Sequence, residues 1–199
     1  MSAQPQPHAY TVEEYLELDR DSPDARYEYY DGYIRLMAGG TNRHHLICTH
    51  VLSVLDTALA DGPCSALTSD CRVQIDAARY VYPDVTVTCD PADLEGDIVR
   101  APVVVFEVLS PSTEAFDRGR KADYYRMVPS LLEYVLIEQN KMSVQVQRRF
   151  NNSNLWTLEN YGEGDSITFT SVNVTIALAT IYHKIIFPPA TGPSFLDTP

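Results

Sequence analysis

One stretch of the chain, residues 102–109 (PVVVFEVL), limits the possible folds more than any other. A run of this length that does not alternate between apolar and polar residues is typical of a central strand with both faces covered. The run carries one ionisable side chain, Glu107. Because burying a lone ionised carboxylate is costly, Glu107 requires an ionic partner, a raised pKa or a metal ion.

A second carboxylate, Asp84, lies in segment 81–89, which alternates as a half-buried strand does. If this strand is a neighbour of the strand that carries Glu107, the two carboxylates converge on one site. An all-oxygen site of this kind suits Mg²⁺ or Mn²⁺. The alternative is a structural pair in which each acid is bonded to Arg, Lys or a backbone N–H. Spacing alone leaves both interpretations open.

The remaining segments predict a mixed α/β (α+β) protein. A capping box, Thr11 to Glu14, predicts a short helix that ends near Leu18, and Asp31-Gly32 predicts a hairpin. Apolar periodicity predicts helices at 42–60 and 114–127 and a last helix near 174–183. Further strands are expected at 64–76, 132–138, 142–150, 154–160 and 166–170. The whole chain, 1–199, is expected to form a single domain, with a core at about 10–187 and loose tails at both ends.

The predicted helix at 114–127 supplies a cation. Asp117, Lys121 and Tyr125 are spaced so that they share one helix face. Lys121 reaches the two carboxylates if that face packs on the sheet. The alternative is a surface ion pair between Lys121 and Asp117, which contributes little to stability.

The composition narrows the function and the compartment. The formal net charge of −12 argues against broad, non-specific nucleic-acid binding, which depends on neutralising phosphates. The N-terminus does not resemble a signal peptide and no apolar stretch is long enough to span a membrane, so we expect a cytoplasmic protein. The four cysteines are expected to be buried free thiols rather than zinc ligands or disulfides.

Seven segments in order, EYYDG, HHLI, YPDVTV, VVFEVLSPST, DRGRK, YY and PSLLEYVLI, together resemble the Uma-type putative restriction endonuclease family. That family belongs to the PD-(D/E)XK nuclease superfamily, and the resemblance covers roughly residues 10–187. It implies a restriction-endonuclease-like fold, in which a mixed β-sheet is flanked by helices.

The resemblance also implies roles for particular residues. Pro83-Asp84 matches the PD of the family and Glu107 matches its second acidic residue, so both look like metal ligands, with the backbone carbonyl of Val108 as a further candidate. Glu28 resembles the acid that the superfamily often contributes from an N-terminal element. His44 matches the histidine of the family, although a lone helical histidine is more often structural.

One position departs from the superfamily pattern. Leu109 occupies the place where the catalytic lysine normally stands, two residues after the second acid. Lys121 on the following helix is the natural substitute, and we expect it to point towards Asp84 and Glu107.

The implied function is Mg²⁺- or Mn²⁺-dependent hydrolysis of DNA by an endonuclease. Two alternatives stay open: a degenerate nuclease fold that serves as a binding or assembly module, and phosphodiester chemistry on RNA or a nucleotide. A homodimer is expected, because cutting both strands of a duplex favours two copies of the site.

Overall fold

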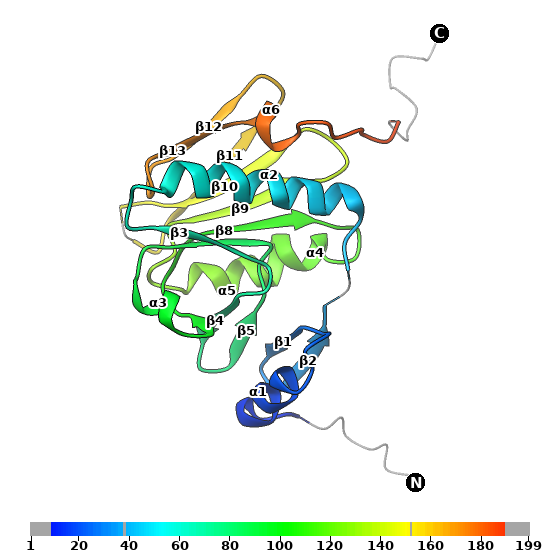
Figure 1. Cartoon of the computed structure of the whole chain (residues 1–199), viewed down its shortest axis with the longest axis vertical. Coiled ribbons are helices and arrows are strands. Elements are labelled where there is room, and N and C mark those ends of the chain that lie inside the picture. The colour runs from blue at the N-terminus through cyan, green and yellow to red at the C-terminus, as the bar shows by residue number, and fades with distance from the viewer. Residues whose placement is uncertain (1–8, 38, 152, 190–199) are drawn as a thin grey trace.

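The computed structural model describes residues 9–37, 39–151 and 153–189, and the predicted tails lie largely outside these residues. The larger of two main sheets has the strand order β11-β10-β9-β8-β6-β3 (Figure 1). Only the β8–β9 pair is parallel in this sheet, so the predicted mixed sheet is confirmed. The strands are β3 (Ser65–Thr68), β6 (Val85–Thr88), β8 (Pro102–Leu109), β9 (Glu133–Glu138), β10 (Val144–Arg149) and β11 (Trp156–Tyr161).

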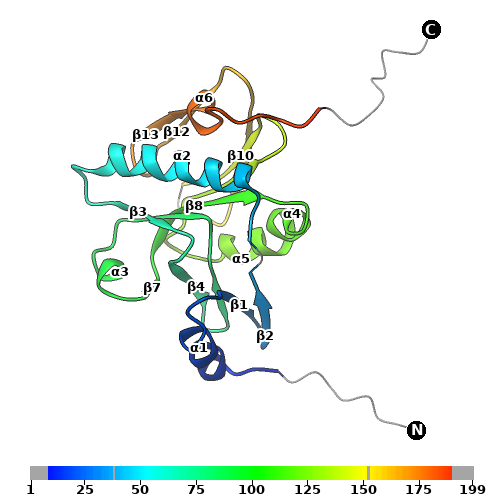
Figure 2. The same cartoon turned by 45° about the vertical axis from the view of Figure 1, so that its right-hand side comes forward.

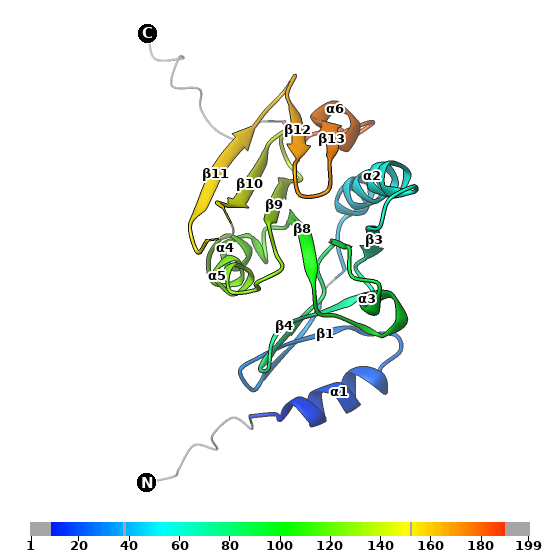
Figure 3. The ribbon, with the colours of Figure 1, turned by 90° about the vertical axis from the view of Figure 1, so that its left-hand side faces the viewer.

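The central strand β8 is covered on both faces, as its apolar sequence predicts. Val104, Phe106 and Val108 pack into the core beneath α2 (Asn42–Leu59). The same core includes residues of the hairpin formed by β12 (Ser166–Phe169) and β13 (Val174–Ala177), and of the short helix α6 (Leu178–Ile181). Val105 and Leu109 face the opposite core. Helices α4 (Glu114–Phe116) and α5 (Ala122–Arg126) cover that side, as Figure 3 shows.

A second sheet has the strand order β2-β1-β5-β4-β7 and lies beside the first (Figure 2). Its strands are β1 (Tyr27–Tyr30), β2 (Tyr33–Leu36), β4 (Arg72–Asp76), β5 (Arg79–Val81) and β7 (Ile98–Val99), and α3 (Ala92–Glu95) precedes β7. Helix α1 (Val12–Arg20) begins with the predicted capping box and packs Tyr15 against Tyr29 and Tyr80. The predicted hairpin at Asp31-Gly32 joins β1 to β2, and both turn residues have the positive φ of such turns.

Two predicted strands are each divided between the two sheets. Segment 64–76 forms β3 in the larger sheet and β4 in the smaller one, because the polar turn of Ser69 and Asp70 separates them. Segment 81–89 is likewise divided, since the strand stops before Pro83, which cannot donate to a ladder, and resumes at Val85. Asp84 therefore lies where the chain passes from one sheet to the other.

Two predicted helices also differ from the structure. Residues 174–177 form the strand β13, in which buried Val174 and Ile176 alternate with exposed Thr175; only 178–181 are helical. The helix expected at 114–127 is kinked at Gly119, whose φ of −104° and ψ of −106° are not helical. The segment that contains this kink, η1 (Asp117–Lys121), joins α4 to α5.

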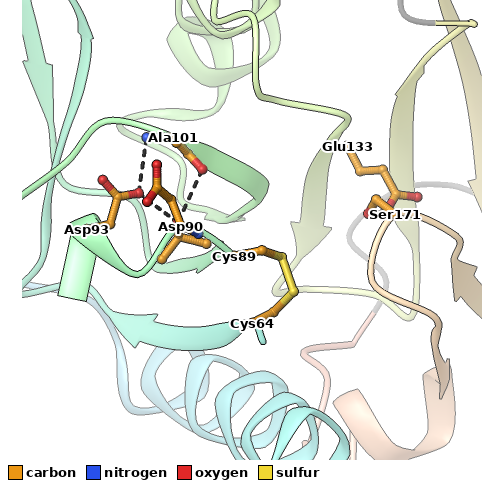
Figure 4. The surroundings of a disulfide bond; sticks show 8 residues. Cys64, Cys89, Asp90, Asp93, Ala101, Glu133 and Ser171 are labelled. Atoms are coloured by element: carbon orange, nitrogen blue, oxygen red, sulfur yellow. Dashed lines mark hydrogen bonds between the residues drawn. A yellow bond between two sulfur atoms is a disulfide. The ribbon is translucent and has the colours of Figure 1, made fainter. Parts of the chain in front are cut away.

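The expectation of four free thiols is wrong for two cysteines. Cys64 and Cys89 form a disulfide, while Cys48 and Cys71 are free. The cause is strand register: Ser65 pairs with Thr88, so the residues immediately outside this pair face each other (Figure 4). Such bonds are commoner in oxidising compartments, and the cytoplasmic location stays a prediction. Within the described residues, no helix combines the length and apolarity that a membrane crossing requires.

Candidate active site

Asp84 and Glu107 come together through the pairing of β6 with β8. Val85 lies opposite Phe106 in this antiparallel pair, which places the preceding Asp84 beside the following Glu107. Both carboxylates line one cavity of about 330 Å³. The backbone N–H of Val108 donates to Asp84 Oδ2 at 2.6 Å and fixes the orientation of that carboxylate. The convergence expected from the sequence is present, and Val108 lines the same cavity.

Glu107 points to the face of the sheet that α4 and α5 cover, where its neighbours are polar. Its Oε1 lies 2.7 Å from Lys121 Nζ and accepts a hydrogen bond of 3.1 Å from the hydroxyl of Tyr125. Only 7% of the Glu107 side chain is exposed. This carboxylate thus has the partners that its place in an apolar strand requires.

Lys121 lies at the centre of the cluster and points towards Glu107, as predicted, in the cavity that Asp84 also lines. Besides Glu107, its Nζ lies 3.0 Å from Glu28 Oε1 and 3.9 Å from Asp117 Oδ1. The side chain is only 5% exposed, so the alternative of a surface ion pair with Asp117 is wrong. Leu109, at the position where a lysine would be expected, is buried in the apolar core under α5.

Glu28 reaches the site from the smaller sheet, as the resemblance implied. The strand β1 carries it, and it is 4% exposed. Its Oε1 contacts Lys121 and accepts a hydrogen bond of 3.4 Å from the backbone N–H of Tyr82, in the segment that leads to Asp84. The acidic residues of the site therefore come from both sheets.

The cluster holds more negative charge than its lysine neutralises. Burial raises the pKa of Glu107 well above its ordinary value; the charge of Lys121 opposes this only in part, and three more carboxylates raise it further, those of Asp117, Asp84 and Glu28. Burial disfavours the charged form of Lys121, but Glu107 and Glu28 prevail and hold its pKa well above the usual range. A proton or an additional cation is therefore required to balance the site.

His44 lies beside Asp84 in the first turn of α2. Its Nε2 is 2.9 Å from Asp84 Oδ1. Burial disfavours the imidazolium, but the hydrogen bond and charge of Asp84 outweigh burial and raise the pKa of His44. Thr41 caps the helix by accepting from the His44 N–H, and Gly40 lies under the ring, where a Cβ atom would come within 2.8 Å of it. The close approach explains why a glycine stands there.

The sequence analysis missed one member of this neighbourhood, Cys48. His44, Cys48 and Asp84 each offer a ligand atom, and these atoms lie within 4.8 Å of one another. The four-residue spacing of His44 and Cys48 on a predicted helix was the signal that could have revealed it. Two arginines close to Lys121 in sequence are paired with acids: Arg118 pairs with Glu114 and Glu138, and Arg126 with Asp123.

The donors present fit a hard divalent cation. Asp84 and Glu107 present carboxylate oxygens to one partly enclosed cavity, and the excess negative charge around Lys121 favours a cation. Oxygen donors of this kind are the ligands that Mg²⁺ and Mn²⁺ prefer.

Comparison with known proteins places these features in a wider group. Residues 12–179 match the family described as "Uma2: Putative restriction endonuclease". Two uncharacterized proteins of Synechocystis, slr1290 and sll1609, are 34% and 29% identical to the chain; the alignments cover 88% and 82% of this chain and 92% and 94% of those proteins. A solved structure from Anabaena variabilis, described as a "putative nuclease", superposes with a TM-score of 0.71 at 18% identity, over 87% of this chain and 97% of that one. The last likeness shows a shared fold.

Proposed function

The chain belongs to the Uma2 family, and from that membership we propose that it is a metal-dependent endonuclease that hydrolyses phosphodiester bonds of DNA. The observation that carries the proposal is the position of Lys121. Its buried Nζ lies within 3.0 Å of Glu28 and Glu107, in the cavity that Asp84 also lines. A buried cation among carboxylates at an accessible cavity suits the stabilisation of negative charge that develops on a phosphate.

The proposed roles follow from the contacts. Asp84 and Glu107 would hold the metal, with the carbonyl of Val108 as a further ligand, and the Val108 N–H keeps Asp84 oriented. A bound Mg²⁺ would polarise the scissile phosphate and lower the pKa of an attacking water. Lys121 stabilises developing negative charge, while Tyr125 and Glu28 hold its neighbourhood in place. His44 positions Asp84 through the hydrogen bond to Oδ1.

A plasmid-cleavage assay tests the proposal. Supercoiled DNA is incubated with the purified protein and Mg²⁺, Mn²⁺ or chelator, with single-stranded RNA as a parallel substrate. We expect nicked or linear DNA only with metal, and none from Asp84→Ala. Asp123→Ala, which alters an exposed carboxylate (69% exposed), serves as the matched control and should cleave as the parent does. Equal cleavage by Asp84→Ala and the parent would contradict the proposal, and cleavage of RNA alone would reassign the substrate.

The second candidate is a non-catalytic binding or assembly module. It is favoured by the protein partners of the two acids: Glu107 pairs with Lys121, while Asp84 accepts from the Val108 N–H and contacts His44. Thermal unfolding with Mn²⁺ and with chelator separates the candidates. A metal site raises the melting temperature as Mn²⁺ is added, whereas a purely structural ion-pair cluster does not respond.

A further inference from the structure

A second set of possible ligands lies beside the proposed oxygen site and differs from it in chemistry. His44 and Cys48 are one turn apart on α2 and share a face of that helix. Asp84 faces them from the passage between the two sheets. The three residues offer a nitrogen, a sulfur and an oxygen atom, all within 4.8 Å of one another.

The nitrogen, sulfur and oxygen donors of this second set favour a different class of ion from the one that the oxygen donors of Asp84 and Glu107 favour. A thiolate and an imidazole are ligands of Zn²⁺ and other borderline or soft ions, whereas Mg²⁺ prefers oxygen donors. Zn–N and Zn–O bonds of roughly 2.0–2.2 Å place two ligand atoms about 3.3 Å apart in a tetrahedron. His44 Nε2 and Asp84 Oδ1 are 2.9 Å apart, so an ion between them requires a shift of only a few tenths of an ångström.

A second cavity, which Glu107 does not line, offers an entry route for the ion. This cavity, of about 670 Å³, is lined by His44, Cys48 and Asp84, among other residues. His44 and Asp84 also line the cavity that contains Glu107, but Cys48 does not. An ion held by Cys48 therefore lies at the border between the two cavities.

We propose that His44, Cys48 and Asp84 form a binding site for a thiophilic divalent ion of the Zn²⁺ class. Three protein ligands leave a fourth tetrahedral position for water, and binding releases the thiol proton of Cys48 to solvent. A consequence rests on the proposed nuclease function. An ion at this site draws Asp84 away from the oxygen site, so that micromolar Zn²⁺ inhibits the Mg²⁺-dependent reaction.

Cobalt spectroscopy tests the site without reference to cleavage. The metal-free full-length protein is titrated with Co²⁺, which reports a thiolate ligand through a near-ultraviolet charge-transfer band and tetrahedral geometry through visible bands. We expect a thiolate band that saturates at one ion per chain and is lost on addition of Zn²⁺. Cys48→Ser should abolish the band.

Two controls exclude the other sulfur atoms. Cys71→Ser, which removes the other free thiol, should keep the band, and so should the double variant Cys64→Ser/Cys89→Ser, which removes the disulfide. Cys48→Ala is the second variant if Cys48→Ser does not give a cooperative melting transition. No thiolate band in the parent, or a band that persists in both Cys48 variants, would overturn the proposal.

The inhibitory consequence is measured separately. Where the parent cleaves DNA with Mg²⁺, the Zn²⁺ concentration for half-inhibition, measured against each protein's own activity without Zn²⁺, should rise at least about tenfold in Cys48→Ser. Equal inhibition of both proteins would refute the consequence. A protein that binds Co²⁺ through Cys48 but never cleaves DNA would support the site and contradict the nuclease function.

Discussion

Lys121 Nζ lies 2.7 Å from Glu107 Oε1, yet the lysine comes from the kinked helix and the carboxylate from the central strand. The ammonium reaches the cluster of acids from the layer above the sheet, and Leu109 beneath it packs into the apolar core. Position 109 of β8, where the lysine would otherwise stand, thus contributes a packing residue. The positive charge comes instead from Lys121 in η1.

Lys121→Ala should abolish metal-dependent cleavage and also destabilise the metal-free protein. The burial of Lys121 among three acids implies a substantial loss of stability beside the loss of activity. Removing one partner of a buried ion pair typically costs about 3–5 kcal/mol. Chemical denaturation of the parent, Lys121→Ala and the exposed control Lys141→Ala measures this loss in the free energy of unfolding. A variant as stable as Lys141→Ala would show that the acids around Lys121 are already protonated.

Lys121→Arg should restore stability better than activity. A guanidinium keeps a positive charge near Glu28 and Glu107, but its planar fork does not replace a compact ammonium in a packed site. Plasmid cleavage and thermal melting of this variant are compared with those of Lys121→Ala. Full activity of Lys121→Arg would indicate that any cation at this position suffices.

Glu107→Gln should raise the stability of the metal-free protein at neutral pH and remove its response to metal. The pKa of Glu107 is raised, so the folded state binds more protons than the unfolded chain above pH about 4.3, where an unfolded Glu titrates. The free energy of unfolding therefore falls as pH rises from there to the folded pKa. Glutamine removes this slope and still leaves Lys121 its contact with Glu28.

Urea denaturation in chelator, between pH 4 and 8, checks the sign of this effect. The free energy of unfolding of Glu107→Gln should exceed that of the parent by an amount that grows with pH, and Mn²⁺ should stabilise only the parent. Glu163→Gln, which alters an exposed carboxylate, is the control and should follow the parent. A parent that gains stability relative to Glu107→Gln as pH rises would show that Lys121 alone keeps Glu107 ionised.

The disulfide should be measurable both as a thiol count and as stability. Thiol titration of the unfolded protein should find two of the four cysteines reactive before reduction and all four afterwards. The bond closes a loop with a sequence separation of 25, for which chain entropy gives roughly 3–4 kcal/mol. Cys64→Ser/Cys89→Ser should lose about that much, while Cys71→Ser should lose far less. Four reactive thiols in freshly purified protein would place the pair in its reduced state.

A homodimer remains our expectation for the assembly of this protein. The edge strand β11 exposes Leu158, which is 55% accessible, and the adjoining Leu155, which is 67% accessible. Edge strands with exposed apolar side chains favour pairing with another chain. Light scattering at micromolar concentration should give about twice the chain mass of 22.3 kDa. A species of one chain mass alone would contradict the dimer, and Leu158→Lys tests whether β11 forms the interface.

The local sequence pattern was sufficient to predict a helix, strand or turn whose formation does not depend on a distant partner. The apolar run of 102–109, the periodicity of α2, the capping box at Thr11 and the turn at Asp31-Gly32 all gave the correct element. The placement of Lys121 followed from helix spacing together with the family resemblance. The catalytic roles of the site residues stay predictions.

Tertiary context decided the rest. Strand β13 forms because Val174 and Ile176 find a partner strand and a core, and a helical pattern over the same residues could not reveal that partner. The pairing of Cys64 with Cys89 depends on the register of β3 against β6, which the sequence does not display. Cys48 joins His44 and Asp84 only because α2 crosses the point where the chain changes sheets.

The passage of the chain between the two sheets at Asp84 makes the assembly of the site depend on complete folding. Glu28 belongs to the smaller sheet, Glu107 to the larger one, and Asp84 to the connection between them. A chain in which either sheet is unformed, during synthesis or after partial unfolding, holds an incomplete set of acids around Lys121. Under the proposed nuclease function, uncontrolled cleavage of DNA would endanger the cell that makes the protein. Because the acidic cluster is complete only in the fully folded chain, immature or damaged copies would not cut DNA.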